Sequence, residues 1–247
     1  MALMTSPDLH EIDSTLPSGW RDFADVLAAG VDRVILYGPP GTGKTFAALH
    51  FGMRSVDSER LICTEDITTA DVTGTWMPTG ESRWEWLEGP AVRAWRSGGR
   101  LVVDEIDRAA GDVVSLLLAM TDTDGSARWR HPQSGEVLEP APGFSAVMTT
   151  NLERLDELPS ALRDRFPVAI HIDRPHPASV WRLSEDLRRP ALNGTLGDAD
   201  RRVSLRAFFA FDQLRAAHGP ERAAMLLFGE TKGRAFLDAL AIASLRA

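Results

Sequence analysis

Short apolar runs alternate with amphipathic segments between Trp20 and Ile172. The runs are rich in valine, isoleucine and leucine and are bounded by turn-forming residues, which is typical of buried strands. In the segments between them, apolar residues recur at the spacing of a helix that packs one face on a sheet. This alternation predicts an α/β fold with a parallel sheet sandwiched by helices. The expected strands are Val34–Tyr37, Arg60–Thr64, Leu101–Val103, Ala146–Thr150 and Val168–Ile172.

Helical periodicity is expected between these strands and again near the end of the chain. One predicted helix has Pro90 in its first turn and Gly98 just past its end, which mark its boundaries. The segment from Thr123 to Gly143 is rich in glycine, proline and serine and predicts a hairpin. The expected helices are Trp20–Ala29, Thr45–Met53, Pro90–Ser97, Asp112–Met120, Leu205–Ala217, Ala223–Phe228 and Thr231–Leu245.

The pattern changes near Asp173. Pro175, Pro177 and Pro190 are expected to break the chain there, and the sequence beyond Asp173 is helical in period with no clear strand. A second, helical domain is therefore expected after the α/β domain. The expected division is a leader at 1–18, an α/β domain at 19–172 and a small helical domain at 173–247.

Composition narrows the class of protein further. With 247 residues, 44% hydrophobic and 25% charged, the chain is ordinary for a globular protein. No apolar run approaches the roughly 20 residues of a membrane span, and no secretory signal is apparent. The single cysteine, Cys63, excludes an internal disulfide and fits a reducing compartment. We therefore expect a cytoplasmic protein with no membrane span, and the net charge of −8 argues against nucleic acid as a partner.

A glycine-rich loop after the first expected strand matches G-x-x-x-x-G-K-[ST] at every fixed position. Its glycines let successive N–H groups point at phosphate oxygens, and the N-terminus of the next helix adds partial positive charge. An ordinary glycine-rich turn would not explain a Lys-Thr pair at this offset, in a chain whose only other lysine is Lys232. The loop therefore predicts nucleotide binding. Its residues are Gly38, Pro39, Pro40, Gly41, Thr42, Gly43, Lys44 and Thr45.

Two carboxylates extend this site. Lys44 is expected to reach the β- and γ-phosphates of the nucleotide, and the Thr45 hydroxyl to bind Mg²⁺. Asp104 and Glu105 follow Leu101–Val103 at the carboxyl edge of the sheet, where open α/β sheets bind ligands. By itself such a pair could be a solvated strand end. Opposite a phosphate loop, Asp104 is expected to hold Mg²⁺, and Glu105 to polarise the water that attacks the γ-phosphate.

Three more side chains could contact the same phosphate. Asn151 follows a strand, where its amide could bond the attacking water, although asparagine is also a common turn residue. Arg163 and Arg165 offer planar, permanently charged groups that suit a γ-phosphate, but both could instead pair with surface carboxylates. Arg165 adjoins Phe166, whose burial would hold the guanidinium in place. We therefore expect Arg165 to be the arginine finger, and Arg163 to pair with a carboxylate or to support it.

Taken in order, these motifs resemble those of AAA+ ATPases. The phosphate loop resembles Walker A, Leu101–Glu105 resembles Walker B, Asn151 resembles sensor 1, and Arg163 and Arg165 resemble the arginine finger. The resemblance implies a P-loop NTPase fold whose helical domain is a lid. Within that lid, Arg206 is similar in position to the family's sensor 2 arginine, which implies a further contact with the γ-phosphate, although a helix-surface arginine is the ordinary interpretation.

The branch that the chain resembles is the MoxR type, which includes CbbQ, NorQ and the gas-vesicle GvpN ATPases. Asp71–Trp76 and Trp86–Pro90 are similar to the insertion in helix 2 that projects toward the pore of the ring. Asp124–Gly143 is similar to the β-hairpin before sensor 1. Trp76, Trp84 and Trp86 could therefore line a pore or, as aromatic residues more commonly do, build core.

The resemblance implies an ATP-hydrolysing, Mg²⁺-dependent ring, expected as a hexamer, that remodels a protein client. Such rings often act with an adaptor that carries a von Willebrand factor A domain. One alternative is the NTPase motor subunit of a nucleic-acid-directed, restriction-like system, against which the acidic balance counts. Another is a scaffold that binds nucleotide but barely hydrolyses it, against which Glu105 and the paired arginines count.

Overall fold

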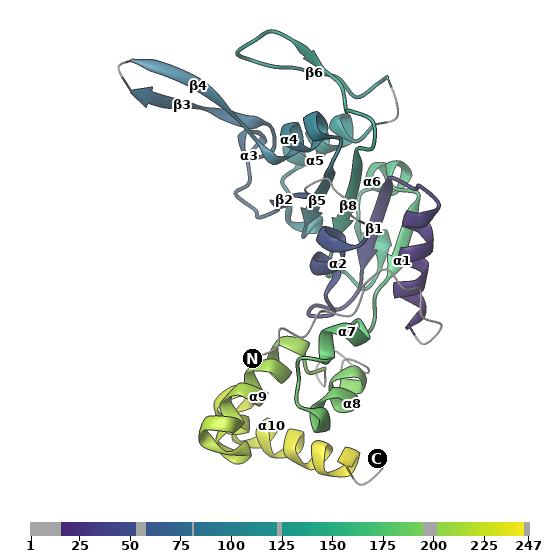
Figure 1. Ribbon diagram of the computed structural model, residues 1–247, viewed down its shortest axis with the longest axis vertical. Helices are drawn as coiled ribbons and strands as arrows, with labels where there is room; N and C mark the ends of the chain where they lie inside the picture. Colours follow the sequence, from purple (N-terminus) through teal and green to yellow (C-terminus); the bar gives the residue numbers. More distant parts are fainter. Residues whose placement is uncertain (1–15, 53–57, 81, 123–124, 195–201, 245–247) are drawn as a thin grey trace, which may run out of the picture. The chain divides into compact units, whose positions relative to one another are not determined.

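The computed structural model of the protein describes residues 16–52, 58–80, 82–122, 125–194 and 202–244 (Figure 1). Contacts between Cα atoms divide the chain into two compact units. The α/β unit comprises residues 21–38 and 44–171, and the helical unit contains the chain from Ile172 onward together with residues 39–43. Several expected features lie outside the described residues, namely the leader up to residue 15, Met53, Thr123, Asp124 and Leu245.

The α/β unit is built on a parallel sheet of five strands in the order β2-β5-β8-β1-β9. This confirms the predicted parallel sheet. One strand lies two residues earlier than expected, because β2 begins at the polar residue Ser58, which pairs in register with Arg100. The apolar pattern alone could not show this. The strands are β1 Arg33–Tyr37, β2 Ser58–Ile62, β5 Arg100–Asp104, β8 Ser145–Thr149 and β9 Val168–His171.

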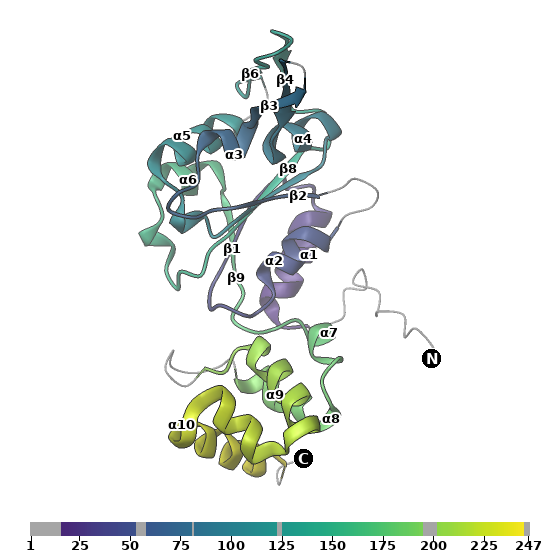
Figure 2. The ribbon, with the colours of Figure 1, turned by 90° about the vertical axis from the view of Figure 1, so that its left-hand side faces the viewer.

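Helices cover both faces of the sheet. Figure 2 shows α1 and α2 on one side and α3, α4 and α5 on the other. The second face carries a large apolar core in which Trp95, Leu101 and Leu117 are fully buried. Burial of these side chains accounts for the sandwich that the sequence predicts. The helices of this unit are α1 Ser18–Ala28, α2 Lys44–His50, α3 Thr69–Thr73, α4 Pro90–Ser97, α5 Gly111–Met120 and α6 Ser160–Arg165, with 3₁₀ turns η1 Ile106–Arg108 and η2 Leu155–Glu157.

Two antiparallel hairpins extend from this unit on the same side (Figure 1). The hairpin of β6 (Trp129–Arg130) and β7 (Val137–Leu138) confirms the one predicted there. The other, of β3 (Gly74–Gly80) and β4 (Arg83–Glu88), has no counterpart among the predicted strands. Glycine and proline interrupt this stretch, so its alternation is too short to be recognised.

The tryptophans of the β3–β4 hairpin lie on one of its faces. Trp76 pairs directly with Trp86, and Pro78 pairs with Trp84, and side chains at paired positions share a face. Trp76 and Trp84 are 41% and 58% exposed, so of the two alternatives the one in which they build core does not hold. Trp86 is half-buried, its ring 6.1 Å from that of Trp129, and its amide donates to Gln133 Oε1 at 3.1 Å. The two hairpins are therefore in contact.

The helical unit has its own apolar core, with Leu187, Phe208 and Phe236 among its buried residues. The expected break at Pro190 is wrong, because Pro190 lies inside α8. A proline inside a helix costs about 3 kcal/mol or more, and burial of the flanking Leu187 and Ala191 offsets that cost. The helices are α7 Pro177–Val180, α8 Glu185–Gly194, α9 Leu205–His218 and α10 Pro220–Ser244, the last interrupted by non-helical backbone at Gly229. Within the described part of the chain, no helix combines the length and apolar character needed to cross a membrane.

Candidate nucleotide-binding site

The phosphate loop connects β1 to α2, which begins at Lys44. Gly38, Gly41 and Gly43 have φ angles of 123°, 79° and 97°, a region that glycine adopts readily because it lacks a Cβ. The Gly38 amide donates to the Leu152 carbonyl at 3.1 Å. The start of the loop is therefore fixed to the segment that follows β8.

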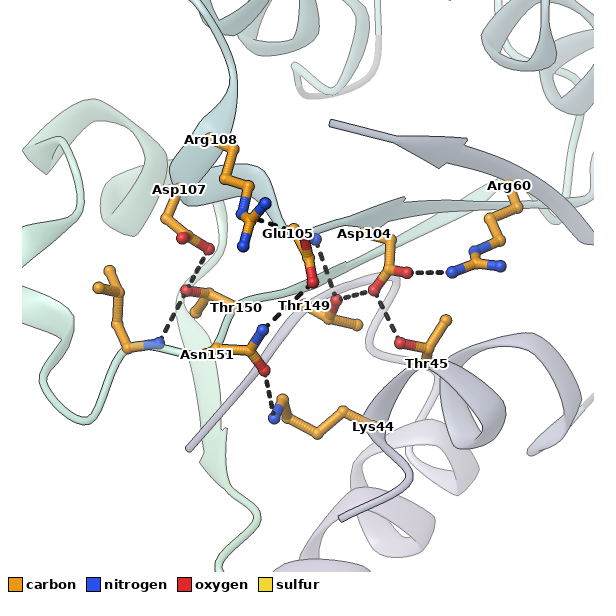
Figure 3. Close-up of polar contacts among 11 residues, drawn as sticks. Lys44, Thr45, Arg60, Asp104, Glu105, Asp107, Arg108, Thr149, Thr150 and Asn151 are labelled. Carbon is orange, nitrogen blue, oxygen red and sulfur yellow. Dashed lines mark hydrogen bonds and ion pairs between the residues drawn. The ribbon is translucent and has the colours of Figure 1, made fainter. Parts of the chain in front are cut away.

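Lys44 places its ammonium group at the carboxyl edge of the sheet. Its Nζ donates to the Gly38 carbonyl at 2.8 Å. It also donates to Asn151 Oδ1 at 3.1 Å (Figure 3). Burial lowers the pKa of Lys44 to about 8, although nearby carboxylates, Asp104 first among them, act in the opposite direction. A buried cation in this position attracts phosphate oxygens more strongly than one in open solvent.

Asp104, the last residue of β5, accepts hydrogen bonds from three side chains (Figure 3). Thr45 Oγ1 donates to Oδ1 at 2.7 Å, Thr149 Oγ1 donates to the same oxygen, and Arg60 Nη2 pairs with Oδ2. Burial raises the pKa of Asp104, but the bonds from Thr149, Arg60 and Thr45 outweigh burial and hold that pKa below its usual value. The carboxylate is therefore ionised at neutral pH.

Glu105 lies beside this carboxylate in an unusual backbone conformation. Its φ and ψ of 56° and 48° are left-handed, which is uncommon for a residue other than glycine. The side chain accepts a hydrogen bond from Asn151 Nδ2 at 3.3 Å and pairs with Arg108 Nε at 3.1 Å (Figure 3). The turn after β5 thus directs Glu105 toward the asparagine that also contacts Lys44.

Asn151 is held in place by its neighbours in the chain. Thr150 Oγ1 donates to Asp107 Oδ1 at 2.6 Å and accepts from the Leu152 amide at 3.1 Å (Figure 3). These bonds fix the backbone on both sides of Asn151. Its amide can therefore lie between the Lys44 ammonium and the Glu105 carboxylate, where a water attacking a phosphate would need to be oriented.

The two arginines of α6 differ in their surroundings. Arg165 Nη2 donates to Asp122 Oδ2 at 2.8 Å, and its side chain is 30% exposed. Arg163 is exposed, and its backbone amide donates to the Pro159 carbonyl at 3.3 Å, but among the described residues its side chain has no hydrogen bond or ion pair. Of the two roles expected for Arg163, pairing with a carboxylate is found instead at Arg165, which the α6 surface places beside Asp122, and support of Arg165 by Arg163 stays a prediction. Phe166 is buried, as predicted.

Arg206 lies in the other compact unit. It is an exposed residue in the first turn of α9, next to Ser204, whose hydroxyl caps that helix by accepting from the Ala207 amide at 3.2 Å. The capping hydroxyl explains why α9 begins at Leu205. A contact of Arg206 with the γ-phosphate remains a prediction.

The residues around Asp104 suit a Mg²⁺ ion. Mg²⁺ prefers carboxylate, hydroxyl and phosphate oxygens, and the Thr45 hydroxyl and the Asp104 carboxylate lie 2.7 Å apart at the start of the phosphate-loop helix. The ionised state of Asp104 supplies the negative charge that such an ion requires. Thr45 and Asp104 therefore fit the metal that accompanies a nucleoside triphosphate.

Three residues that lie around the site and contact its carboxylates were not identified from the sequence. Thr149 and Arg60 contact Asp104, and Arg108 contacts Glu105. Arg60 lay on a predicted strand, but its relation to Asp104 depends on β2 and β5 being neighbours, and strand order cannot be obtained from the apolar pattern. Arg108 had a local signal, since it follows Glu105 at the three-residue spacing at which side chains meet in a helical turn.

Comparison with known proteins covers the part of the chain that carries these residues. The family model of the AAA domain (dynein-related subfamily) matches residues 33–166, which is more than half of the chain. The denitrification regulatory protein NirQ of Stutzerimonas stutzeri is 30% identical over 154 residues, which cover 61% of this chain and 54% of that protein.

Staphylococcal proteins are similar over a comparable share of the chain. An uncharacterized protein of Staphylococcus aureus (strain bovine RF122 / ET3-1) is 32% identical over 149 residues, covering 57% of this chain and 55% of that protein. One from Staphylococcus epidermidis (strain ATCC 35984) is 29% identical over 148 residues, with the same two shares. The chain thus matches about half the length of these relatives.

Proposed function

Since the chain belongs to the AAA domain family (dynein-related subfamily), we propose that it hydrolyses ATP at the site formed by the phosphate loop, β5 and β8. The observation that carries the proposal is the convergence of complementary groups on one edge of the sheet. Lys44, Asn151 and Glu105 are linked by hydrogen bonds, and Thr45 is bonded to Asp104 beside them. These are the cation, amide, base and metal ligands that phosphoryl transfer to water requires.

Binding of the nucleotide is proposed to depend on the loop and on Lys44. The amides of residues 38–45 and the N-terminus of α2 face the phosphates, while the Lys44 ammonium neutralises the β- and γ-phosphate oxygens. Thr45 and Asp104 would hold Mg²⁺, whose chemistry there would be to withdraw charge from the phosphates. Lys44 exchanges its bond to the Gly38 carbonyl for bonds to phosphate oxygens and keeps its bond to Asn151 Oδ1.

Hydrolysis is proposed to depend on Glu105 and Asn151. The Glu105 carboxylate takes a proton from the attacking water, and the Asn151 amide orients that water against the γ-phosphate. The bond between Asn151 Nδ2 and Glu105 Oε1 already places the two groups side by side. Arg108 holds the other carboxylate oxygen of Glu105 and so fixes which oxygen is presented.

The active assembly is proposed to be a ring, a hexamer, in which Arg165 of one subunit completes the site of its neighbour. The exposed α6 surface that carries Arg163 and Arg165 supports this proposal, as do the two hairpins with their exposed tryptophans. The work done by hydrolysis is proposed to be the remodelling of a protein client, with a von Willebrand factor A domain protein as adaptor. The relative NirQ of Stutzerimonas stutzeri is named a denitrification regulatory protein, and a regulatory action on a client protein is consistent with this proposal.

Phosphate release from ATP by the purified chain tests the proposal. Specific activity is expected to rise with protein concentration, because isolated subunits lack the neighbour's arginine. Two further measurements distinguish this proposal from the alternative of a nucleic-acid-directed motor. One compares the hydrolysis of GTP with that of ATP, and the other measures ATP hydrolysis with double-stranded DNA added. Stimulation by DNA would contradict the proposal of a protein client, and a flat specific activity on dilution to monomers would contradict a shared site.

A further inference from the structure

Arg60 and Asp104 form an ion pair across two neighbouring strands. In the β2–β5 register Arg60 lies opposite Val102 and Ile62 lies opposite Asp104. Residues two apart on a strand share a face, so Arg60 and Asp104 are diagonal neighbours on one face of the sheet. The pair joins an Arg60 side chain that is 41% exposed to an Asp104 side chain that is 7% exposed.

The orientation of Asp104 does not depend on this pair. Its Oδ1 accepts from both Thr45 and Thr149, and these two hydroxyls fix the plane of the carboxylate. Arg60 contacts only Oδ2. What Arg60 adds is a positive charge beside an almost buried negative one, and an ionised carboxylate in such a place is costly without a counter-ion.

The same positive charge opposes a second cation. A Mg²⁺ ion at Thr45 and Asp104 would lie close to the Arg60 guanidinium and would be repelled by it, while competing for the same carboxylate. Because the Arg60 side chain reaches solvent, it can leave Oδ2 without stranding a buried charge.

We propose that Arg60 is the counter-ion of Asp104 when Mg²⁺ is absent, and that it sets a lower affinity for Mg²⁺ than the carboxylate alone would have. This inference rests on the proposed function, since it concerns the metal that accompanies the nucleotide. Arg60 is not placed among the groups that touch the reacting phosphate. Its effect is on the concentration of Mg²⁺ at which the nucleotide becomes firmly bound.

The test is a titration of Mg²⁺ against the affinity of the full chain for mant-ADP, a fluorescent nucleotide. Arg60→Gln removes the charge but keeps a polar side chain, and Arg60→Lys restores the charge. Arg60→Met serves as a second neutral variant. The matched control is Arg93→Gln, which removes an arginine that is paired at 2.7 Å with Glu59, the neighbour of Arg60 on β2, away from the site.

For Arg60→Gln and Arg60→Met we expect the midpoint Mg²⁺ concentration to fall about three- to tenfold, with the metal-free Kd measured in EDTA unchanged. Arg60→Lys and Arg93→Gln are expected to keep the midpoint of the wild-type chain. A midpoint Mg²⁺ concentration that stays the same or rises in both neutral variants would overturn the inference. A metal-free Kd for mant-ADP that changes by about three- to tenfold would also overturn it. Failure of the wild-type chain to bind mant-ADP would instead contradict the proposed function.

Discussion

Lys44 donates a hydrogen bond to Asn151 at 3.1 Å, although the two residues are 107 positions apart in the chain. The other end of the same amide donates to Glu105. One side chain thus connects the group expected to bind the γ-phosphate with the group expected to activate water. A change in the phosphate would be transmitted to Glu105 through a single rigid amide.

Replacing Asn151 tests this connection. Asn151→Ala is expected to lower the rate of ATP hydrolysis by about ten- to a hundredfold, because the attacking water loses its orienting group. Nucleotide affinity should change by less than about threefold, since Lys44 and the loop remain. Single-turnover hydrolysis and equilibrium binding measure the two quantities separately. Asn193→Ala, at the chain's only other asparagine, is the control, and an equal loss of affinity and rate would contradict the role assigned to Asn151.

Glu105→Gln should separate binding from hydrolysis. The amide keeps the size of the side chain and can still bond to Asn151, but it cannot accept a proton from water. We expect turnover to fall at least about tenfold while ATP still binds. Radiolabelled ATP retained on the protein, compared with phosphate released, gives the measurement. Near-normal phosphate release would remove Glu105 from the mechanism.

The pKa of Lys44 predicts proton uptake on binding. Burial lowers this pKa to about 8 in the nucleotide-free chain, so the ammonium loses its charge as the pH rises through that value. Phosphate favours the charged form, and binding at a pH of about 9 should therefore take up a proton, whereas binding at a pH of about 6.5 should not. Affinity should fall correspondingly above a pH of about 8.

Calorimetry in buffers of different ionisation enthalpy measures this uptake. Lys44→Met is expected to bind weakly and with no dependence on the buffer. Binding by the wild-type chain whose heat is the same in all buffers at the higher pH would show that Lys44 remains charged there.

The ion pair between Arg165 and Asp122 provides a test of whether Arg165 is the arginine finger of a neighbouring subunit. If Arg165 acts on a neighbouring subunit, it must leave Asp122 to do so, and Asp122→Asn should preserve or raise hydrolysis. Arg165→Ala should abolish most hydrolysis with little change in affinity, and Arg163→Ala should do less.

Mixed rings provide the decisive measurement. Combining Arg165→Ala with Glu105→Gln subunits lets an intact arginine face an intact glutamate, so part of the activity should return. If the two variants co-assemble and no activity returns, Arg165 does not act across the interface, and the exposed Arg163 becomes the better candidate.

The elements that could be predicted from the sequence are those that short stretches of sequence determine by themselves. The phosphate loop is specified by its own glycines, and β5 by an uninterrupted apolar run that ends in Asp104. The Arg60–Asp104 pair was not predictable, because it depends on which strands are neighbours. The expectation that Pro190 would break the chain failed for a related reason. Burial within the helical unit outweighs the low intrinsic helix propensity of proline.

The left-handed backbone of Glu105 places two requirements on one position. A residue other than glycine or asparagine in this conformation carries a strain of about 1 kcal/mol or more. Glycine at position 105 would relieve the strain and make the folded chain more stable, but it would delete the carboxylate. Selection for thermal stability and selection for turnover therefore oppose each other at Glu105, and a library screened for stability alone should enrich inactive proteins at this residue.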